Sequence, residues 1–151
     1  MPDIAFEHTY VALLIVSFLA ATLLPLGSEW LLVALLLGGK SPFLVVVIAT
    51  IGNTLGGATN YLLGRWGSTW LIRKVLRITP EQQHRAESWF TRYGSLSLLL
   101  SWLPVVGDPL CLVAGTLRTS LSRFFILVTT GKALRYISLT WLTLRGSELL
   151  L

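Results

Sequence analysis

The chain has 151 residues, of which 54% are hydrophobic and only 13% are charged, and its mean hydropathy is +0.72. A soluble domain carries about 25% charged residues, so this composition excludes an ordinary soluble protein and indicates that lipid covers much of the surface. The net charge of +5 does not indicate nucleic-acid binding, because the basic residues lie between apolar segments rather than on one polar face. The length favours one membrane domain over residues 1–151.

The first apolar region, residues 10–39, is interrupted near its centre by Pro25, Gly27 and Glu29. It is too long for one upright span and too short for two, because a span takes about 20 residues. We therefore predict a re-entrant helical hairpin that turns at Pro25–Glu29. The residues before it include Asp3 and no Lys or Arg, so we expect the N-terminus to be retained rather than cleaved as a secretory signal.

Residues 41–64 carry no charge and predict a complete transmembrane helix. The connector that follows holds half of the chain's 12 Lys and Arg residues within residues 65–92, and the positive-inside rule places it in the cytoplasm. Within it, Thr79 is a predicted N-cap, and Gln82 completes a capping box. Apolar residues then recur at helical spacing: Ala86, Trp89, Phe90 and Tyr93. This amphipathic helix lies either on the membrane surface or against the helical bundle.

The second half repeats this order of segments. Residues 94–117 are apolar on both sides of Asp108, and Pro104 and Gly107 precede that acid. We predict a second re-entrant hairpin that turns at Pro104–Pro109. A last apolar span, residues 124–144, follows a short basic segment.

The two hairpins match in detail, which indicates an internal repeat. In both, a proline precedes the carboxylate by four residues, and Glu29 and Asp108 are separated by the same 79 residues as their prolines. At that offset Gly52 aligns with Gly131, and Asn53 aligns with Lys132. We predict repeats over about residues 10–65 and 93–145, joined by a connector over about 66–92.

The positions of the basic segments give the two repeats opposite orientations. If the connector is cytoplasmic, the first hairpin enters from outside and the second from inside. The fold class predicted is therefore an all-α integral membrane protein, an inverted repeat of a re-entrant hairpin plus a transmembrane helix, with a cytoplasmic amphipathic helix between. Inverted repeats with paired broken helices are typical of secondary transporters, whose site lies near the membrane midplane.

Glu29 and Asp108 are the candidate functional residues, because an acid at this depth costs about 3 kcal/mol or more. A protonated carboxyl avoids most of that cost, so such a group can take a proton from one side and release it to the other. The alternative is that each acid only stabilises its own hairpin. Lys132 and Arg135 share one face of the last helix, where they can neutralise the acids or bind an anionic headgroup. Asn53 is polar at membrane depth and can line the same cavity.

Other features favour packing over chemistry. Gly52 and Gly56 form a GxxxG pattern, which allows close contact between membrane helices. The single cysteine, Cys111, has apolar neighbours and is expected to pack as a small hydrophobic residue. The sequence contains no phosphate loop, HExxH or Gly-x-Ser-x-Gly motif. We therefore expect no enzyme activity, cofactor or metal site.

Several motifs, in order and spacing, carry a resemblance to a known family. The chain resembles the DedA family, whose eukaryotic relatives share the VTT domain, and within it the small YqaA-type branch. The resemblance covers roughly residues 15–140. It rests on Gly52-Asn53-Thr54-Leu55-Gly56, Gly64-Arg65, Phe90-Thr91-Arg92-Tyr93-Gly94, Leu103-Pro104, Ala114-Gly115 and Gly131-Lys132-Ala133-Leu134-Arg135.

The resemblance implies a multi-pass protein of the bacterial inner membrane with two opposed re-entrant hairpins. It also implies lipid transport or scrambling driven by the proton-motive force, with undecaprenyl phosphate and phospholipids as proposed substrates. Glu29 corresponds to the family's early membrane acid. The chain departs from the pattern at Asn53, where many members carry Asp, and at Ser101 and Asp108, where many carry Arg.

The leading hypothesis is therefore a proton-coupled lipid flippase or scramblase that supports envelope integrity, with membrane lipids as partners. Two alternatives stay open. One is a non-transporting membrane scaffold for envelope or division proteins, and the other is a small ion or solute transporter. A homo-oligomer is compatible with each of these readings.

Overall fold

In the computed structural model, the described residues are 2–22, 27–67 and 69–150, and they form helices and no strand. The predicted all-α class is confirmed for this part of the chain. Pro25 of the first predicted turn lies outside it. The helices in chain order are α1 (Pro2–Ala20), α2 (Glu29–Leu37), α3 (Pro42–Trp66), α4 (Thr69–Val75), α5 (Pro80–Tyr93), the 3-10 helix η1 (Gly94–Leu100), α6 (Gly107–Thr116) and α7 (Leu121–Leu150).

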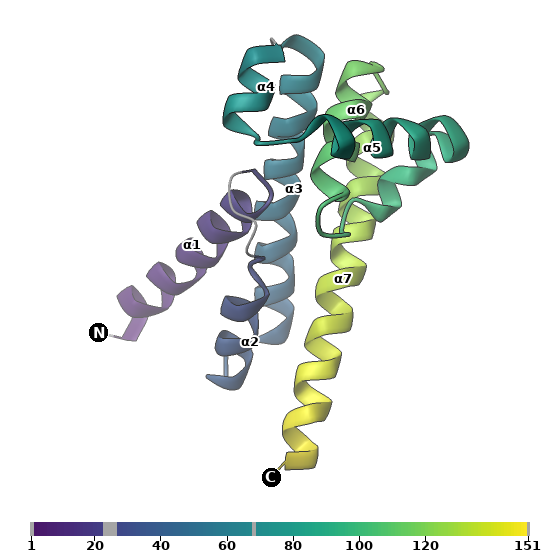
Figure 1. Ribbon diagram of the computed structural model, residues 1–151. Helices are drawn as coiled ribbons and strands as arrows, with labels where there is room; N and C mark the ends of the chain where they lie inside the picture. The colour runs from purple at the N-terminus through teal and green to yellow at the C-terminus, as the bar shows by residue number, and fades with distance from the viewer. Residues whose placement is uncertain (1, 23–26, 68, 151) are drawn as a thin grey trace.

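Two long helices, α3 and α7, form the frame of the bundle and run in opposite directions (Figure 1). The 25 residues of α3 extend about 37 Å at 1.5 Å per residue, enough to cross a hydrocarbon core of about 30 Å. Among the described helices, α3 alone has both the length and the hydropathy of a membrane span. Helix α7 is 30 residues long but carries Lys132 and Arg135 in its middle.

Helix α1 packs on α3 through the GxxxG pattern, so the packing interpretation of these glycines is confirmed. A Cβ atom on Gly52 would lie 2.5 Å from the Leu14 carbonyl oxygen, and one on Gly56 would lie 2.6 Å from the Phe18 oxygen. Only glycine allows the two backbones to approach this closely. Asn60 adds a polar contact by donating from Nδ2 to the Ala21 carbonyl at 2.8 Å. Helix α2 lies beside the beginning of α3 (Figure 1), where Leu32 and Leu36 pack with Val45 and Ala49.

The connector forms α4 and α5 at the end of the bundle where α3 ends (Figure 1). The predicted capping box is present: the Thr79 hydroxyl accepts from the Gln82 N–H, and the Gln82 side chain accepts from the Thr79 N–H. Helix α5 buries Ala86 and Phe90 against α6 and η1 and leaves its charged side exposed. It therefore packs against the bundle, and the exposed Tyr93 is not part of its buried face.

The second reversal lies between η1 and α6, beside α7. Helix α6 begins at Gly107, so the turn covers residues 101–106 rather than the predicted Pro104–Pro109. The shift occurs because Pro109, which has no N–H, fits in the first turn of a helix, where that donor has no partner. Gly107 sits directly against the Ser101 carbonyl, where a Cβ would overlap it, and donates its N–H to Leu103 at 2.9 Å.

Helix α6 packs on α3 by the same glycine-mediated contact as α1 does. A Cβ on Gly64 would overlap the Leu112 carbonyl, and a Cβ on Gly115 would overlap the Tyr61 carbonyl. Around this contact lies an apolar core in which Cys111 is fully buried, as its setting predicts. Together these contacts bring both chain reversals against the middle of α3 and α7.

Candidate functional site

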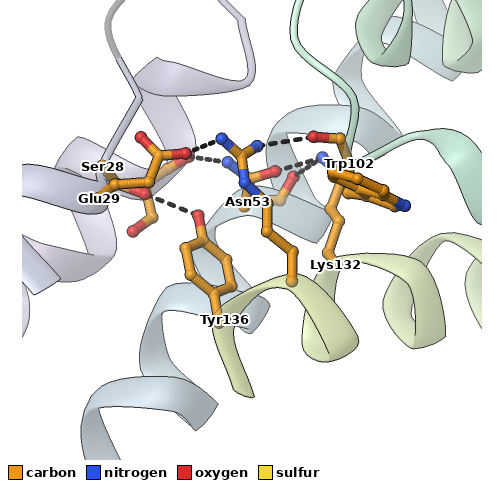
Figure 2. Close-up of polar contacts among 8 residues, drawn as sticks. Ser28, Glu29, Asn53, Trp102, Lys132 and Tyr136 are labelled. Carbon is orange, nitrogen blue, oxygen red and sulfur yellow. Dashed lines mark hydrogen bonds and ion pairs between the residues drawn. The ribbon is translucent and has the colours of Figure 1, made fainter. Parts of the chain in front are cut away.

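A cluster of polar side chains lies where the two reversals meet α3 and α7 (Figure 2). Ser28 and Glu29 come from the start of α2, and Trp102 comes from the turn before α6. Asn53 is in the middle of α3, and Lys132 and Tyr136 are on α7. Because these elements come from both halves of the chain, the cluster joins the two halves inside the bundle.

Arg135 links the first half of the chain to the second. Its guanidinium forms an ion pair with Glu29, and its Nη1 donates to the Trp102 carbonyl at 2.7 Å. The side chains of Arg135 and Glu29 are each 25% exposed, so water or a ligand can reach the pair. Glu29 is the first residue of α2, where the helix dipole favours a negative charge.

Lys132 is almost completely buried, with 1% of its surface exposed. Its Nζ donates to the Asn53 carbonyl oxygen at 2.7 Å and also to the Asn53 side-chain oxygen. Asn53 in turn donates from Nδ2 to the Ser17 carbonyl on α1 at 3.1 Å. Within the described residues no carboxylate forms an ion pair with Lys132. The amine is therefore held by neutral oxygens, which offset part of the cost of burying it.

Tyr136 ties α7 to the start of α2. Its hydroxyl lies 2.6 Å from the Ser28 hydroxyl, and both residues are buried. We expect Tyr136→Phe to destabilise the protein by about 1 kcal/mol, because the Ser28 hydroxyl would lose its buried partner. Thermal unfolding of the purified protein in detergent measures this, with Tyr93→Phe at an exposed position as the control. An unchanged melting temperature for Tyr136→Phe would show that the hydrogen bond does not hold α2 in place.

Asp108 is the second residue of α6 and faces the same region. Among the described residues, none forms a hydrogen bond or ion pair with its carboxylate, in contrast to Glu29. Its carboxylate is thus available to protons or to a ligand in the cavity described next.

Glu29 and Asp108 line a single cavity of about 290 Å³. Arg135 and Asn53 lie between them on its wall, and Gly27 and Pro104 contribute from the two reversals. Lys132 is not part of the lining and lies behind Asn53. The remaining wall comes from the end of α1, the turn after η1 with the start of α6, and the connector with the start of α5: Ala20, Ala21, Thr22, Ser101, Trp102, Leu103, Val105, Pro109, Leu76, Arg77, Ile78 and Gln82.

Three groups of the polar cluster are not predicted from the sequence: the hydroxyls of Tyr136 and Ser28 and the carbonyl of Trp102. Tyr136 and Ser28 were overlooked because a tyrosine and a serine in apolar sequence are common, although Tyr136 lies one helical turn after Lys132. The carbonyl of Trp102 could not be found, because a backbone acceptor has no residue-type signal. The described part of the chain has no group of three His, Cys, Asp or Glu side chains that could hold a metal ion.

A cavity lined by charged residues between apolar helices, one of which is long enough to cross a bilayer, fits a helical membrane protein. Comparison with known proteins agrees. The chain matches the VTT domain over residues 11–143. It is 50% identical over 131 residues to the inner membrane protein YqaA of Escherichia coli (strain K12), covering 86% of this chain and 87% of that protein.

The chain therefore belongs to the DedA family of VTT-domain proteins, as a YqaA-type member, and is a protein of the bacterial inner membrane. A Haemophilus influenzae protein is 38% identical over 135 residues, covering 84% of this chain and 82% of its own length. An alkaline phosphatase-like protein of Lactococcus lactis (strain IL1403) is 31% identical over 96 residues, which are 58% of this chain and 45% of that protein. No solved structure gives a significant match.

Proposed function

We propose that this protein moves lipids across the inner membrane and couples their movement to protons. The observation that carries the proposal is that Glu29 and Asp108, one from each half of the chain, line one cavity inside an apolar bundle. Acids at such depth are expensive to keep and mark transport pathways in membrane proteins. The proposed activity changes no covalent bond, needs no cofactor, and takes phospholipids or undecaprenyl phosphate as substrates, which are the substrates that the family resemblance implies.

The packing of the helices supports the inverted repeat that such a transporter requires. In the first half of the chain α1 packs on α3, and in the second half η1 packs on α7 in the same way. Likewise α2 of the first half packs on α7, and α6 of the second half packs on α3. Gly52 faces α1 and Gly131 faces η1 at matched positions. Asn53 and Lys132, which are aligned by the repeat, are in direct contact. An approximate two-fold axis between α3 and α7, with a re-entrant hairpin entering from each side, accounts for all of these contacts.

The Glu29–Arg135 ion pair supports the proposed proton coupling. When Glu29 is ionised, it holds the guanidinium of Arg135. When Glu29 accepts a proton, the ion pair is lost and the Arg135 donor that faced Glu29 can turn to an anionic headgroup, to which a guanidinium donates strong charge-assisted hydrogen bonds. Release of the proton on the other side would restore the pair and displace the headgroup. Asp108 offers a second carboxyl in the same cavity for the proton's path.

The test is to reconstitute the purified protein in liposomes and follow fluorescent lipids between leaflets, with and without a pH gradient. We expect faster movement of at least one phosphate-bearing lipid in the presence of the gradient, and loss of that gain when a protonophore removes the gradient. Protein-free liposomes are the control. Lipid-independent flux of ions would instead indicate a small ion transporter. If neither lipids nor ions moved, the alternative of a non-transporting membrane scaffold would be favoured over a transporter.

A further inference from the structure

The cavity has an edge formed by the short connector between α4 and α5. Leu76 and Ile78 are buried there, 9% and 7% exposed, in an apolar cluster with Leu112 of α6. Arg77 lies between these two anchors, is exposed, and lines the cavity. An exposed residue that also lines a cavity marks its opening, so Arg77 stands at the entrance on the side of the basic connector.

The backbone of Arg77 is held in a left-handed conformation, with φ of 52°. It follows the last turn of α4, a position where proteins normally use glycine because a side chain is strained there. Arg118 adopts the same conformation after α6, with φ of 53°, but does not line the cavity. The chain thus contains two strained arginines in equivalent local positions, of which only one faces the site.

Arg77 differs from the other cations of the site in having free donors. Arg135 is bound to Glu29 and to the Trp102 carbonyl, and Lys132 is bound to Asn53. Among the described residues, none forms a hydrogen bond or ion pair with Arg77. A guanidinium with five free donors in a planar fork matches a phosphate group, which it can bind through two parallel hydrogen bonds.

We propose that Arg77 binds the phosphate group of the substrate at the cavity opening and thereby selects phosphate-bearing ligands. This inference rests on the proposed function for the identity of the substrate, but it concerns binding and not movement. The two arginines permit a matched comparison. Arg77→Gly and Arg118→Gly each remove one positive charge and relieve the strain of one residue in the left-handed backbone conformation. Only Arg77→Gly removes a group from the cavity.

The experiment measures binding to the full-length protein in detergent by calorimetric titration. The probes are a short-chain phosphatidic acid, the corresponding uncharged diacylglycerol, and inorganic phosphate. We expect the wild-type protein to bind phosphatidic acid and not diacylglycerol. Arg77→Gly should bind phosphatidic acid at least tenfold more weakly, Arg77→Lys should fall between the two, and Arg118→Gly should match the wild type. Both glycine variants should have a raised Tm, because the strain at φ near 50° is relieved.

A raised Tm with weakened binding separates a binding role from a structural one, since a structural arginine would lose stability when replaced. If inorganic phosphate binds as tightly as phosphatidic acid, the ligand at this residue is free phosphate; if it binds far more weakly, the ligand is a lipid headgroup. Either result supports a phosphate site. Wild-type affinity in Arg77→Gly, an equal loss in Arg118→Gly, or no binding of either phosphate probe by the wild type would overturn the proposal. If the protein binds phosphatidic acid through Arg77 but moves no lipid in liposomes, the proposed transport function is wrong and the phosphate site at Arg77 still stands.

Discussion

Glu29→Gln is expected to abolish the part of lipid movement that depends on the pH gradient, whereas Glu29→Asp should keep a measurable share of it. Glutamine can hydrogen-bond like a neutral carboxyl, but it cannot take up or release a proton. Its amide oxygen can still accept a hydrogen bond from Arg135, but the ion pair is lost and no proton can switch it on or off. Aspartate keeps a carboxyl group that can take up and release a proton, but its side chain is shorter by one methylene. Lipid movement in liposomes across a series of imposed pH gradients measures the effect.

The control for this variant is Glu148→Gln. Glu148 is also paired with an arginine, Arg145, but its side chain is 68% exposed, at the far end of α7. An exposed pair contributes about 0–1 kcal/mol, so this change should leave both folding and lipid movement unaltered. If Glu29→Gln moved lipid at the wild-type rate and with the wild-type response to the gradient, Glu29 would not be the coupling group.

Gly115→Ala and Gly64→Ala are expected to be the most destabilising of the small substitutions. Each would place a methyl group on a backbone carbonyl of the opposite helix, Tyr61 for Gly115 and Leu112 for Gly64. A backbone oxygen within a helix cannot rotate away as a side chain can, so α3 and α6 would have to separate. Overpacking of this kind costs about 1–3 kcal/mol. The separation would also shift Asp108 on α6 relative to the cavity.

Unfolding can be followed through the only cysteine, because Cys111 is fully buried and becomes reactive towards a thiol-specific fluorophore when the bundle opens. Gly146→Ala in α7 is the matched control, since nothing lies within 4 Å of an added Cβ there. It should raise stability slightly, because alanine is the better helix former by about 1 kcal/mol. Equal stability of Gly115→Ala and Gly146→Ala would contradict the close contact between α3 and α6.

The sequence determined much of the architecture because composition and periodicity act locally. The uncharged stretch of α3, the capping box at Thr79 and the GxxxG spacing of Gly52 and Gly56 all lie in residues near one another in the chain, whereas the partner of those glycines, α1, does not follow from the spacing. Family membership and the inner-membrane location also followed from short motifs and were confirmed by comparison. The turn before α6 was misplaced by a few residues, since a proline can belong either to a turn or to the first turn of a helix.

The pairing of charges was decided by the tertiary structure. The sequence showed two acids and two bases at membrane depth, but not that Arg135 binds Glu29 while Lys132 binds the neutral Asn53. Nor did it show that Arg77 of the connector, remote in sequence, stands at the opening of their cavity. Ion pairs and cavities depend on how separate helices pack, with contacts that span about 80–110 residues of chain. The sequence by itself thus determined which charges this membrane protein must keep inside, and only the packing of α2, α3 and α7 decided which of them are paired and which remain free.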